Sequence, residues 1–192
     1  MHPLNFLRVG AAGAEIVTVA EAKAQLRVTH AFDDAYITSL IPVAREFTED
    51  YVKRSLVAQT WQVGYEGWPC GSSRILELCR PVPNAIVSLK YQTSAEEVTL
   101  DAGLYSLDKL STRGAVVLKK AFTFPTLSAD FENKIVVEFT TLPDSSELYK
   151  SAIKLVVAHL YNNRSAASME SLKEMPLGFA DILRLKILPN SL

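Results

Sequence analysis

Paired acidic residues are the first candidates for chemistry in this sequence. Asp33-Asp34 and Glu96-Glu97 could supply the two carboxylates of general acid and base catalysis. Neighbouring residues diverge by about 100° on a helix and point to opposite faces of a strand, so neither pair converges on a substrate. We expect the first pair to begin a helix and the second to lie solvated in a turn.

Histidines and cysteines offer a second set of candidates. His30 and His159 could act as bases, but the sequence has no G-x-S-x-G elbow that would supply a nucleophile. We expect His159, on an apolar helix face, to be packed and satisfied by one hydrogen bond. Cys70 and Cys79 are too few for a disulfide framework or a four-cysteine zinc site, and we expect free thiols. The sequence therefore predicts no catalytic residue, no metal site and no cofactor.

Composition narrows the function classes further. The 192 residues carry 20 Lys and Arg against 21 Asp and Glu, so the net charge of −1 provides no basic field for tight nucleic-acid binding. Trp61 and Trp68 could stack on bases, but Trp61 alternates with Val63 and Tyr65, which favours a sheet core. No apolar run approaches the ~20 residues of a membrane helix. Residues 1–14 lack a signal-peptide pattern, and we expect a cytoplasmic origin.

Two helices are predicted in the first third of the chain. Thr18 and Glu21 form a capping box, which predicts a short helix to about residue 28. Asp33 and Asp34 begin a longer amphipathic helix to about residue 53, in which Pro42 predicts a kink rather than a break. The polar face of this helix is either solvated or a contact surface. It carries Arg45, Glu46, Glu49 and Lys53.

The middle and end of the chain predict strands followed by helices. Period-two alternation begins after Val57, and the predicted strands are 61–65, 74–78, 85–91, 105–107, 115–119 and 134–141, with a loop over 122–131. A D-S-S-E capping box at Asp144 predicts a helix to Arg164. A flexible connector over 165–174 then precedes an amphipathic segment over 177–188, which either folds back onto the core or is held for a partner.

These elements predict an α+β fold in a single domain over residues 1–192. Its parts are N-terminal helices (1–56), a central antiparallel β region of short strands (57–143), a long helix (144–164), and a connector with a C-terminal tail (165–192). On the residues alone, this is a domain that works by making contacts.

Six stretches of sequence resemble the head–tail connector (adaptor) family of tailed bacteriophages and prophages, in its longer form with a β region between the helices. Pro42 departs from the family pattern, which continues an Ala-rich helix there. The stretches are T-V-A-E-A-K-A-Q-L-R-V from Thr18, D-D-A-Y-I-T-S-L-I from Asp33, R-S-L-V-A-Q-T-W-Q from Arg54, R-P-V-P-N-A-I-V-S-L-K-Y from Arg80, V-A-H-L-Y-N-N-R from Val157 and M-P-L-G-F from Met175.

The resemblance implies a structural virion protein without catalysis or membrane contact. Such proteins form a ring, a dodecamer by analogy, between the portal and a stopper or tail-completion protein, and double-stranded DNA passes through without sequence-specific binding. The free chain can stay monomeric until the portal templates assembly. The alternatives are a tail-completion or stopper protein, or an unrecognised hydrolase. Candidate ring contacts are Arg45, Glu46, Glu49 and Lys53, and candidate portal contacts are Leu177, Phe179, Ile182, Leu183 and Ile187.

Overall fold

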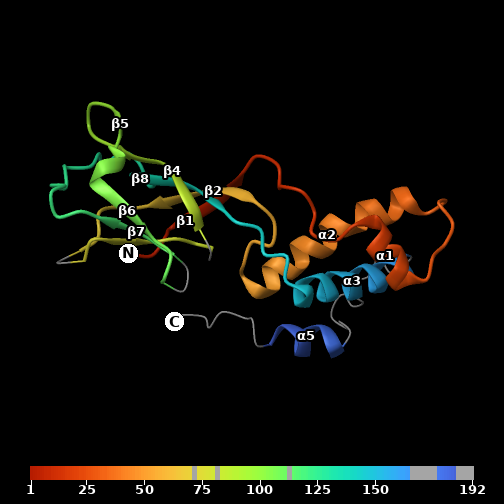
Figure 1. Ribbon diagram of the computed structural model, residues 1–192. Helices are drawn as coiled ribbons and strands as arrows, with labels where there is room; N and C mark the ends of the chain where they lie inside the picture. The colour runs from red at the N-terminus through yellow and green to blue at the C-terminus, as the bar shows by residue number, and fades with distance from the viewer. Residues whose placement is uncertain (71–72, 81–82, 112–113, 165–176, 185–192) are drawn as a thin grey trace. The chain divides into compact units, whose positions relative to one another are not determined.

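The fold is described in a computed structural model, for residues 1–70, 73–80, 83–111, 114–164 and 177–184. The chain forms two compact units. The sheet unit contains Met1–Gly13 and Ala58–Leu142, and the helical unit contains Ala14–Val57 and the described residues from Pro143 onward (Figure 1). The predicted α+β class is confirmed. The predicted β region, 57–143, differs by one residue at each end from the second segment of the sheet unit.

The helical unit begins with the predicted capping box. The Thr18 amide donates to Glu21 Oε2 at 2.7 Å, and the Glu21 amide donates to Thr18 Oγ1 at 3.2 Å. The pKa of the Glu21 carboxyl is lowered first by the bond from the Thr18 amide and then by the bond from the Thr18 hydroxyl, which donates to Glu21 Oε2 at 2.8 Å. Helix α1 (Val19–Leu26) follows the box, as predicted. Because a capping box satisfies two orphan amides within four residues, the sequence alone suffices to place it.

Three further helices of this unit lie in the described residues. The helix α2 (Asp34–Val52) is not broken at Pro42, as predicted, and α3 (Glu147–Asn162) and α5 (Leu177–Leu183) pack with it around one core. No helix among the described residues is long and apolar enough to cross a membrane. The fully buried side chains of this core include Ile37, Ala44, Val52, Leu56, Tyr149, Ala152, Ile153, Val157 and Leu183.

The start of α3 differs from the prediction. Ser146, not Asp144, is the N-cap, and its side chain makes no capping hydrogen bond. The Asp144 carboxylate is used otherwise, because it accepts from the Ser146 amide at 3.3 Å and from Arg54 Nη1 at 3.2 Å. The buried residues of α3 are Tyr149, Ala152, Ile153, Val156 and Val157, and they do not include His159, which was expected on the apolar face.

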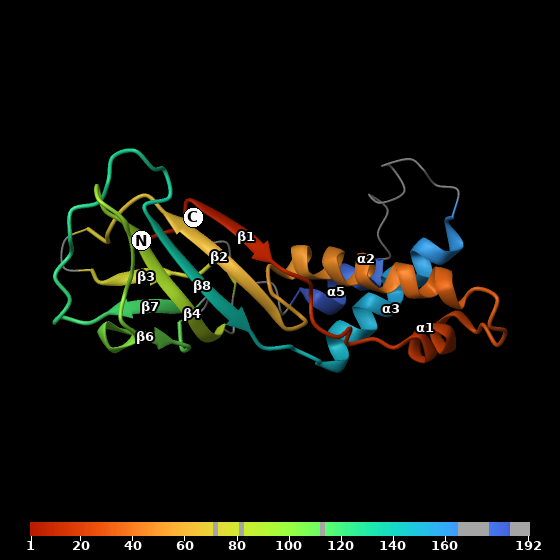
Figure 2. The ribbon, with the colours of Figure 1, turned by 90° about the horizontal axis from the view of Figure 1, so that it is seen from above.

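The sheet unit contains two antiparallel sheets. The larger has the order β1-β2-β8-β4-β5, and the smaller has the order β3-β7-β6; Figure 2 shows β2 lying between β1 and β8. The strands are β1 (Asn5–Val9), β2 (Gln59–Tyr65), β3 (Ile75–Glu77), β4 (Pro83–Gln92), β5 (Glu97–Thr99), β6 (Tyr105–Asp108), β7 (Ala115–Leu118) and β8 (Ile135–Thr141), with a 3-10 turn η1 (Ala102–Leu104) before β6.

Period-two alternation decides which face of the larger sheet is buried. Trp61, Val63 and Tyr65 are buried, and the register pairs Val63 with Val137 at the centre of the sheet. Trp68 packs at the edge of the same core, stacked on Phe124 at 5.2 Å between ring centroids. Both tryptophans therefore belong to the core of the sheet unit, as the alternation predicted for Trp61.

The N-terminal residues correct the prediction that the first 56 residues form helices. Residues 5–9 form β1, which pairs with β2 along its full length from Asn5↔Gly64 to Val9↔Thr60. The residues before β1 also contact β3, because the Met1 amine donates to the Ile75 carbonyl at 2.7 Å and His2 Nδ1 lies 3.0 Å from a Glu77 carboxylate oxygen. Local sequence patterns do not predict this order, because it depends on pairing with β2 and β3, which lie more than 50 residues further along the chain.

Candidate interaction surfaces

The acidic pairs do not converge on a site, as predicted. Asp33 caps α2 and Asp34 begins it, while Glu96 and Glu97 are both exposed. Glu97 differs from the prediction of a turn residue, because it starts β5, where its carboxylate accepts from Lys90 Nζ at 2.8 Å. Among the described residues no group of three or more acidic, histidine or cysteine side chains could hold a metal ion.

The histidine and the cysteines fill ordinary structural roles. His159 is half-buried, so it is packed on one side only, and the expected hydrogen-bond contact joins its Nδ1 to Asn163 Nδ2 at 3.4 Å. His159 lies beside the buried face of α3, whose last buried residues are Val156 and Val157. Cys70 is exposed, Cys79 is half-buried, and both are free thiols as predicted.

The predicted polar face of α2 is only partly exposed. Glu46 and Lys53 are exposed, but Arg45 is 2% exposed and Glu49 is 5% exposed, so the prediction of one solvated face is wrong for these two. Both lie inside the helical unit, where an unpaired charge would be strongly unfavourable.

Arg45 and Glu49 are paired with each other and with neighbouring segments. Arg45 Nη1 donates to Glu49 Oε2 at 2.6 Å, and Arg45 Nε donates to both carboxylate oxygens of Glu15 at 3.0 Å. Glu49 Oε1 accepts from the Leu56 amide at 2.6 Å. Burial lowers the pKa of Arg45, but the nearby carboxylates of Glu49 and Glu15 outweigh it, and the net pKa is raised. The network joins α2 to the chain before and after it.

The exposed part of α2 forms an open hollow of about 480 Å³. Val43 is 53% exposed and Tyr51 is 36% exposed, so the hollow presents apolar surface beside Glu46, Asp50 and Lys53. We call these five residues the α2 surface. It combines two of the four predicted ring contacts, Glu46 and Lys53, with exposed apolar neighbours.

The predicted portal contacts lie in or near α5. Phe179 and Leu183 are buried in the core of the helical unit, and Ile182 packs partly against it. The Phe179 ring centroid lies 5.1 Å from that of Tyr51 and 5.6 Å from that of Phe47. Leu177 begins the helix, and Ile187 lies outside the described residues. Of the two alternatives for this segment, folding back onto the core is observed for Phe179 and Leu183, and their portal contact stays a prediction.

A charged and aromatic cluster fixes the end of α3. Tyr161 Oη donates to Asp33 Oδ2 at 2.5 Å, and Arg164 Nη2 lies 3.0 Å from Asp33 Oδ1. The Arg164 guanidinium also lies 4.5 Å from the ring centroids of both Tyr36 and Tyr161. The hydrogen bond from Tyr161, together with Arg164, lowers the pKa of the Asp33 carboxyl. This cluster holds the last turn of α3 to the first turn of α2.

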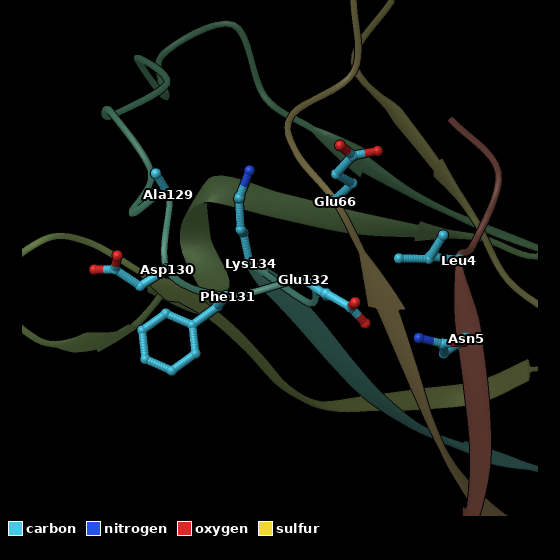
Figure 3. A pocket seen from close by; sticks show the side chains of 8 residues that line it. All are labelled: Leu4, Asn5, Glu66, Ala129, Asp130, Phe131, Glu132 and Lys134. Carbon is cyan, nitrogen blue, oxygen red and sulfur yellow. The ribbon is translucent and has the colours of Figure 1, made fainter.

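A second hollow, of about 490 Å³, lies beside the start of β1 (Figure 3). Leu4 and Asn5 line one side of it, and the loop before β8 lines the other. Figure 3 shows the Glu132 side chain extending from this loop toward β1. We call it the β1 hollow; its lining residues are Leu4, Asn5, Glu66, Ala129, Asp130, Phe131, Glu132 and Lys134. The sequence did not reveal it, because β1 itself was not predicted.

Two loop tips also present apolar side chains that the sequence reasoning missed. Phe32, between α1 and α2, is 92% exposed, and Leu110, between β6 and β7, is 98% exposed. A single apolar side chain within a turn carries no periodic signal, so a pattern search passes over it.

Comparison with known proteins identifies relatives of this fold. The family of phage gp6-like head-tail connector proteins matches residues 16–104, which include α1, α2 and the strands β2–β5. A search of curated protein sequences gave no match. Three chains from solved structures match the fold at TM-scores of 0.77, 0.75 and 0.74, with 18%, 19% and 18% identity and 97% or more of both chains covered.

Those three chains come from gene transfer agent (GTA) particles. Their structures are described as the neck of an empty GTA particle computed with C6 symmetry, the virion of a native GTA particle, and the neck of a native GTA particle computed with C12 symmetry. At this level of identity the likeness establishes the fold, and it extends over both units of the chain.

Proposed function

Residues 16–104 are a gp6-like head-tail connector region, and from this premise we propose that the chain is a structural protein of the virion neck, located at the head–tail junction. The single observation that carries the proposal is the family match, which spans parts of both units. The fold likeness to chains of GTA neck structures supports it over the rest of the chain. The role is structural, and not enzymatic.

We further propose that copies of the chain form a ring. The C6 and C12 symmetry named for the GTA necks supports this arrangement, and a dodecamer is the specific expectation. A closed ring requires two different complementary faces on each subunit. The α2 surface is our candidate for one of them, with Glu46 and Lys53 as the charged contacts, whereas Arg45 and Glu49 stabilise the subunit from within.

The proposed partners are the portal on one side of the ring and a stopper or tail-completion protein on the other. Double-stranded DNA passes through the channel, and a net charge of −1 suits a passage that must not retain phosphates. We retain Leu177, Phe179, Ile182, Leu183 and Ile187 as portal-contact candidates. Because Phe179 and Leu183 are buried, their contact with a portal requires α5 to leave Phe47 and Tyr51.

The test is co-sedimentation of the purified chain with the portal from the same genome, followed by imaging of the complex for rotational symmetry. A symmetric collar on the portal is the expected result. Binding only to a preassembled connector or tail would instead identify a stopper or tail-completion protein. Binding to none of these would overturn the neck assignment.

A chain truncated after Ser168 tests the portal contacts separately. It removes α5 and everything after it, so we expect it to lose portal binding. If the truncated chain stays folded and binds the portal as the full chain does, the assignment of the C-terminal segment to the portal is wrong. Circular dichroism of the truncated chain provides the control for folding.

A further inference from the structure

In the described sheets, the outer edge of β1 has no partner strand anywhere along its length. β1 stands at one end of the larger sheet and pairs with β2 alone, and alternate residues of such a strand direct their amides and carbonyls away from the sheet. The strands at the other ends of the two sheets are shorter, and one of them is partly covered. β5 has three residues and β6 has four, and the edge strand β3 donates from the Glu77 amide to the Met1 carbonyl at 3.0 Å.

β1 lacks most of the usual protection of an edge strand. Phe6 is 57% exposed and Leu7 is 65% exposed, Leu4 just before the strand is 52% exposed, and the strand contains neither lysine nor proline, its one charged residue being Arg8. Natural edges carry such residues, bulges or covers because an open apolar edge pairs with other chains. An edge that is both apolar and open therefore points to a partner that pairs with it.

The β1 hollow gives this edge a charge preference. Three carboxylates line it, from Glu66, Asp130 and Glu132, against the single ammonium of Lys134. Within the described residues neither Glu66 nor Glu132 forms an ion pair, while Asp130 accepts from Ser128 Oγ at 3.2 Å. In Figure 3, Glu66 and Glu132 lie on the side of the hollow nearer to β1, and Asp130 lies at its far end. A cationic side chain placed there would gain favourable interactions with the carboxylates.

We propose that the outer edge of β1 is a strand-addition site for an extended segment of another neck protein, with apolar residues at alternate positions and a lysine or arginine at the end near the β1 hollow. The inference rests on the proposed function and identifies a surface of the same protein. Main-chain hydrogen bonds to β1 supply the pairing, and the side chains of the added strand supply specificity.

The two faces of the added strand meet different surroundings. On one face Phe6 lies against Trp61, with ring centroids 6.0 Å apart, so side chains there extend the apolar core. On the other face Leu7 borders an open space of about 280 Å³ that is also lined by Gln62, Gly64 and Val136. Alternate side chains of the partner segment occupy these two positions, because successive strand residues point to opposite faces.

The experiment is hydrogen exchange at single-residue resolution on the full chain, free and in complex with the portal or the stopper from the same genome. We expect alternate β1 amides to exchange at least about tenfold more slowly in one of these complexes, since strand addition bonds only the outward-facing groups. A complex that forms while all β1 amides exchange at their free rate would overturn the proposal and leave the neck function intact. Absence of any complex would overturn both.

A charge-reversal pair provides the matched control. Glu132→Lys in the β1 hollow is expected to weaken binding of the protecting partner by about tenfold at low salt, with a smaller effect at high salt because of screening. Glu96→Lys makes the same change at an exposed position of the β4–β5 turn and is expected to leave binding unchanged. Equal effects of the two variants would contradict the placement of the basic residue.

Discussion

The two units of this chain differ in how many of their polar groups are paired within the unit. The helical unit closes on itself, since Arg45, Glu49 and Glu15 form an internal ion-pair network and α5 covers Phe47 with Phe179. The sheet unit keeps an apolar strand edge and an acidic hollow open. The difference teaches that the helical unit offers other chains only side chains, at the α2 surface, whereas the sheet unit also offers the unpaired backbone of β1.

Two optical signals distinguish the units during unfolding. The two tryptophans of the chain, Trp61 and Trp68, both lie in the sheet unit, so tryptophan fluorescence reports on that unit. The α-helices all lie in the helical unit among the described residues, so circular dichroism at the helical band reports on that one. Variants of each unit can therefore be followed by the signal of that unit.

The largest expected effect comes from breaking the buried ion pair. Arg45→Met leaves the Glu49 carboxylate buried without its guanidinium, which costs about 3–5 kcal/mol in comparable proteins. We expect urea unfolding followed by circular dichroism to shift to lower urea by the corresponding amount. Glu46→Ala, at an exposed position of the same helix, should change the free energy of unfolding by less than about 0.5 kcal/mol.

The double variant Arg45→Met/Glu49→Gln sharpens this test. The glutamine removes the buried negative charge, while its amide oxygen can still accept from the Leu56 amide. We therefore expect the double variant to be more stable than Arg45→Met alone. If it is less stable, the cost of Arg45→Met comes from lost packing and not from the unpaired carboxylate.

Removing the aromatic contact of α5 is expected to open the helical unit locally. Phe179→Ala deletes a fully buried ring, a change that costs about 3 kcal/mol or more, so the amides of α5 should exchange roughly 100-fold faster. Asp181→Ala, at an exposed position of the same helix, is the control and should leave exchange nearly unchanged. Slow exchange of α5 in Phe179→Ala would mean that α5 is held by contacts other than this ring.

Acid should weaken the helical unit through Asp33. The pKa of this carboxyl is lowered in the folded state by Tyr161 and Arg164, so its stabilisation is complete above the ordinary value of 3.8 and is lost as the pH falls through the folded-state pKa. We expect Asp33→Asn to lose less stability than the natural chain between about pH 5 and pH 2. Asp181→Asn should follow the natural chain. Identical pH profiles for all three would contradict a role for Asp33.

Local signals explain how much of the fold the sequence predicted. The capping box at Thr18, the continuous helix through Pro42 and the alternation around Val63 depend on residues within a few positions of each other. β1 was missed because it exists only through its pairing with β2, more than 50 residues further along. The Asp144 capping box failed because Arg54, 90 residues away, binds the carboxylate.

Contacts between distant segments also explain why the sequence did not predict the candidate surfaces. Arg45 and Glu49 fall on the polar side of the α2 pattern, and their burial becomes favourable through Glu15 and the Leu56 amide, which come from other segments. The β1 hollow requires the loop before β8 to lie beside β1, which no spacing in the sequence encodes. Phe179 was identified correctly as part of an apolar stripe, but periodicity alone does not say whether such a stripe packs internally.

The smallest expected effect tests how tightly the open side of the sheet unit is packed. A Cβ atom at Gly64 would lie 2.2 Å from Asn133 Oδ1 and 2.6 Å from its Cγ, so the Asn133 side chain must move. Gly64→Ala should therefore also break the 3.3 Å hydrogen bond from Asn5 Nδ2 to Asn133 Oδ1, at a cost of about 1 kcal/mol, measured by urea unfolding with tryptophan fluorescence. In an Asn133→Ala background the obstruction is gone, and Gly64→Ala should be neutral or slightly stabilising because alanine restricts the unfolded chain more than glycine does. An equal cost in both backgrounds would show that the strand backbone, and not Asn133, requires glycine here, and the β1 edge would then be more rigid than its open surface indicates.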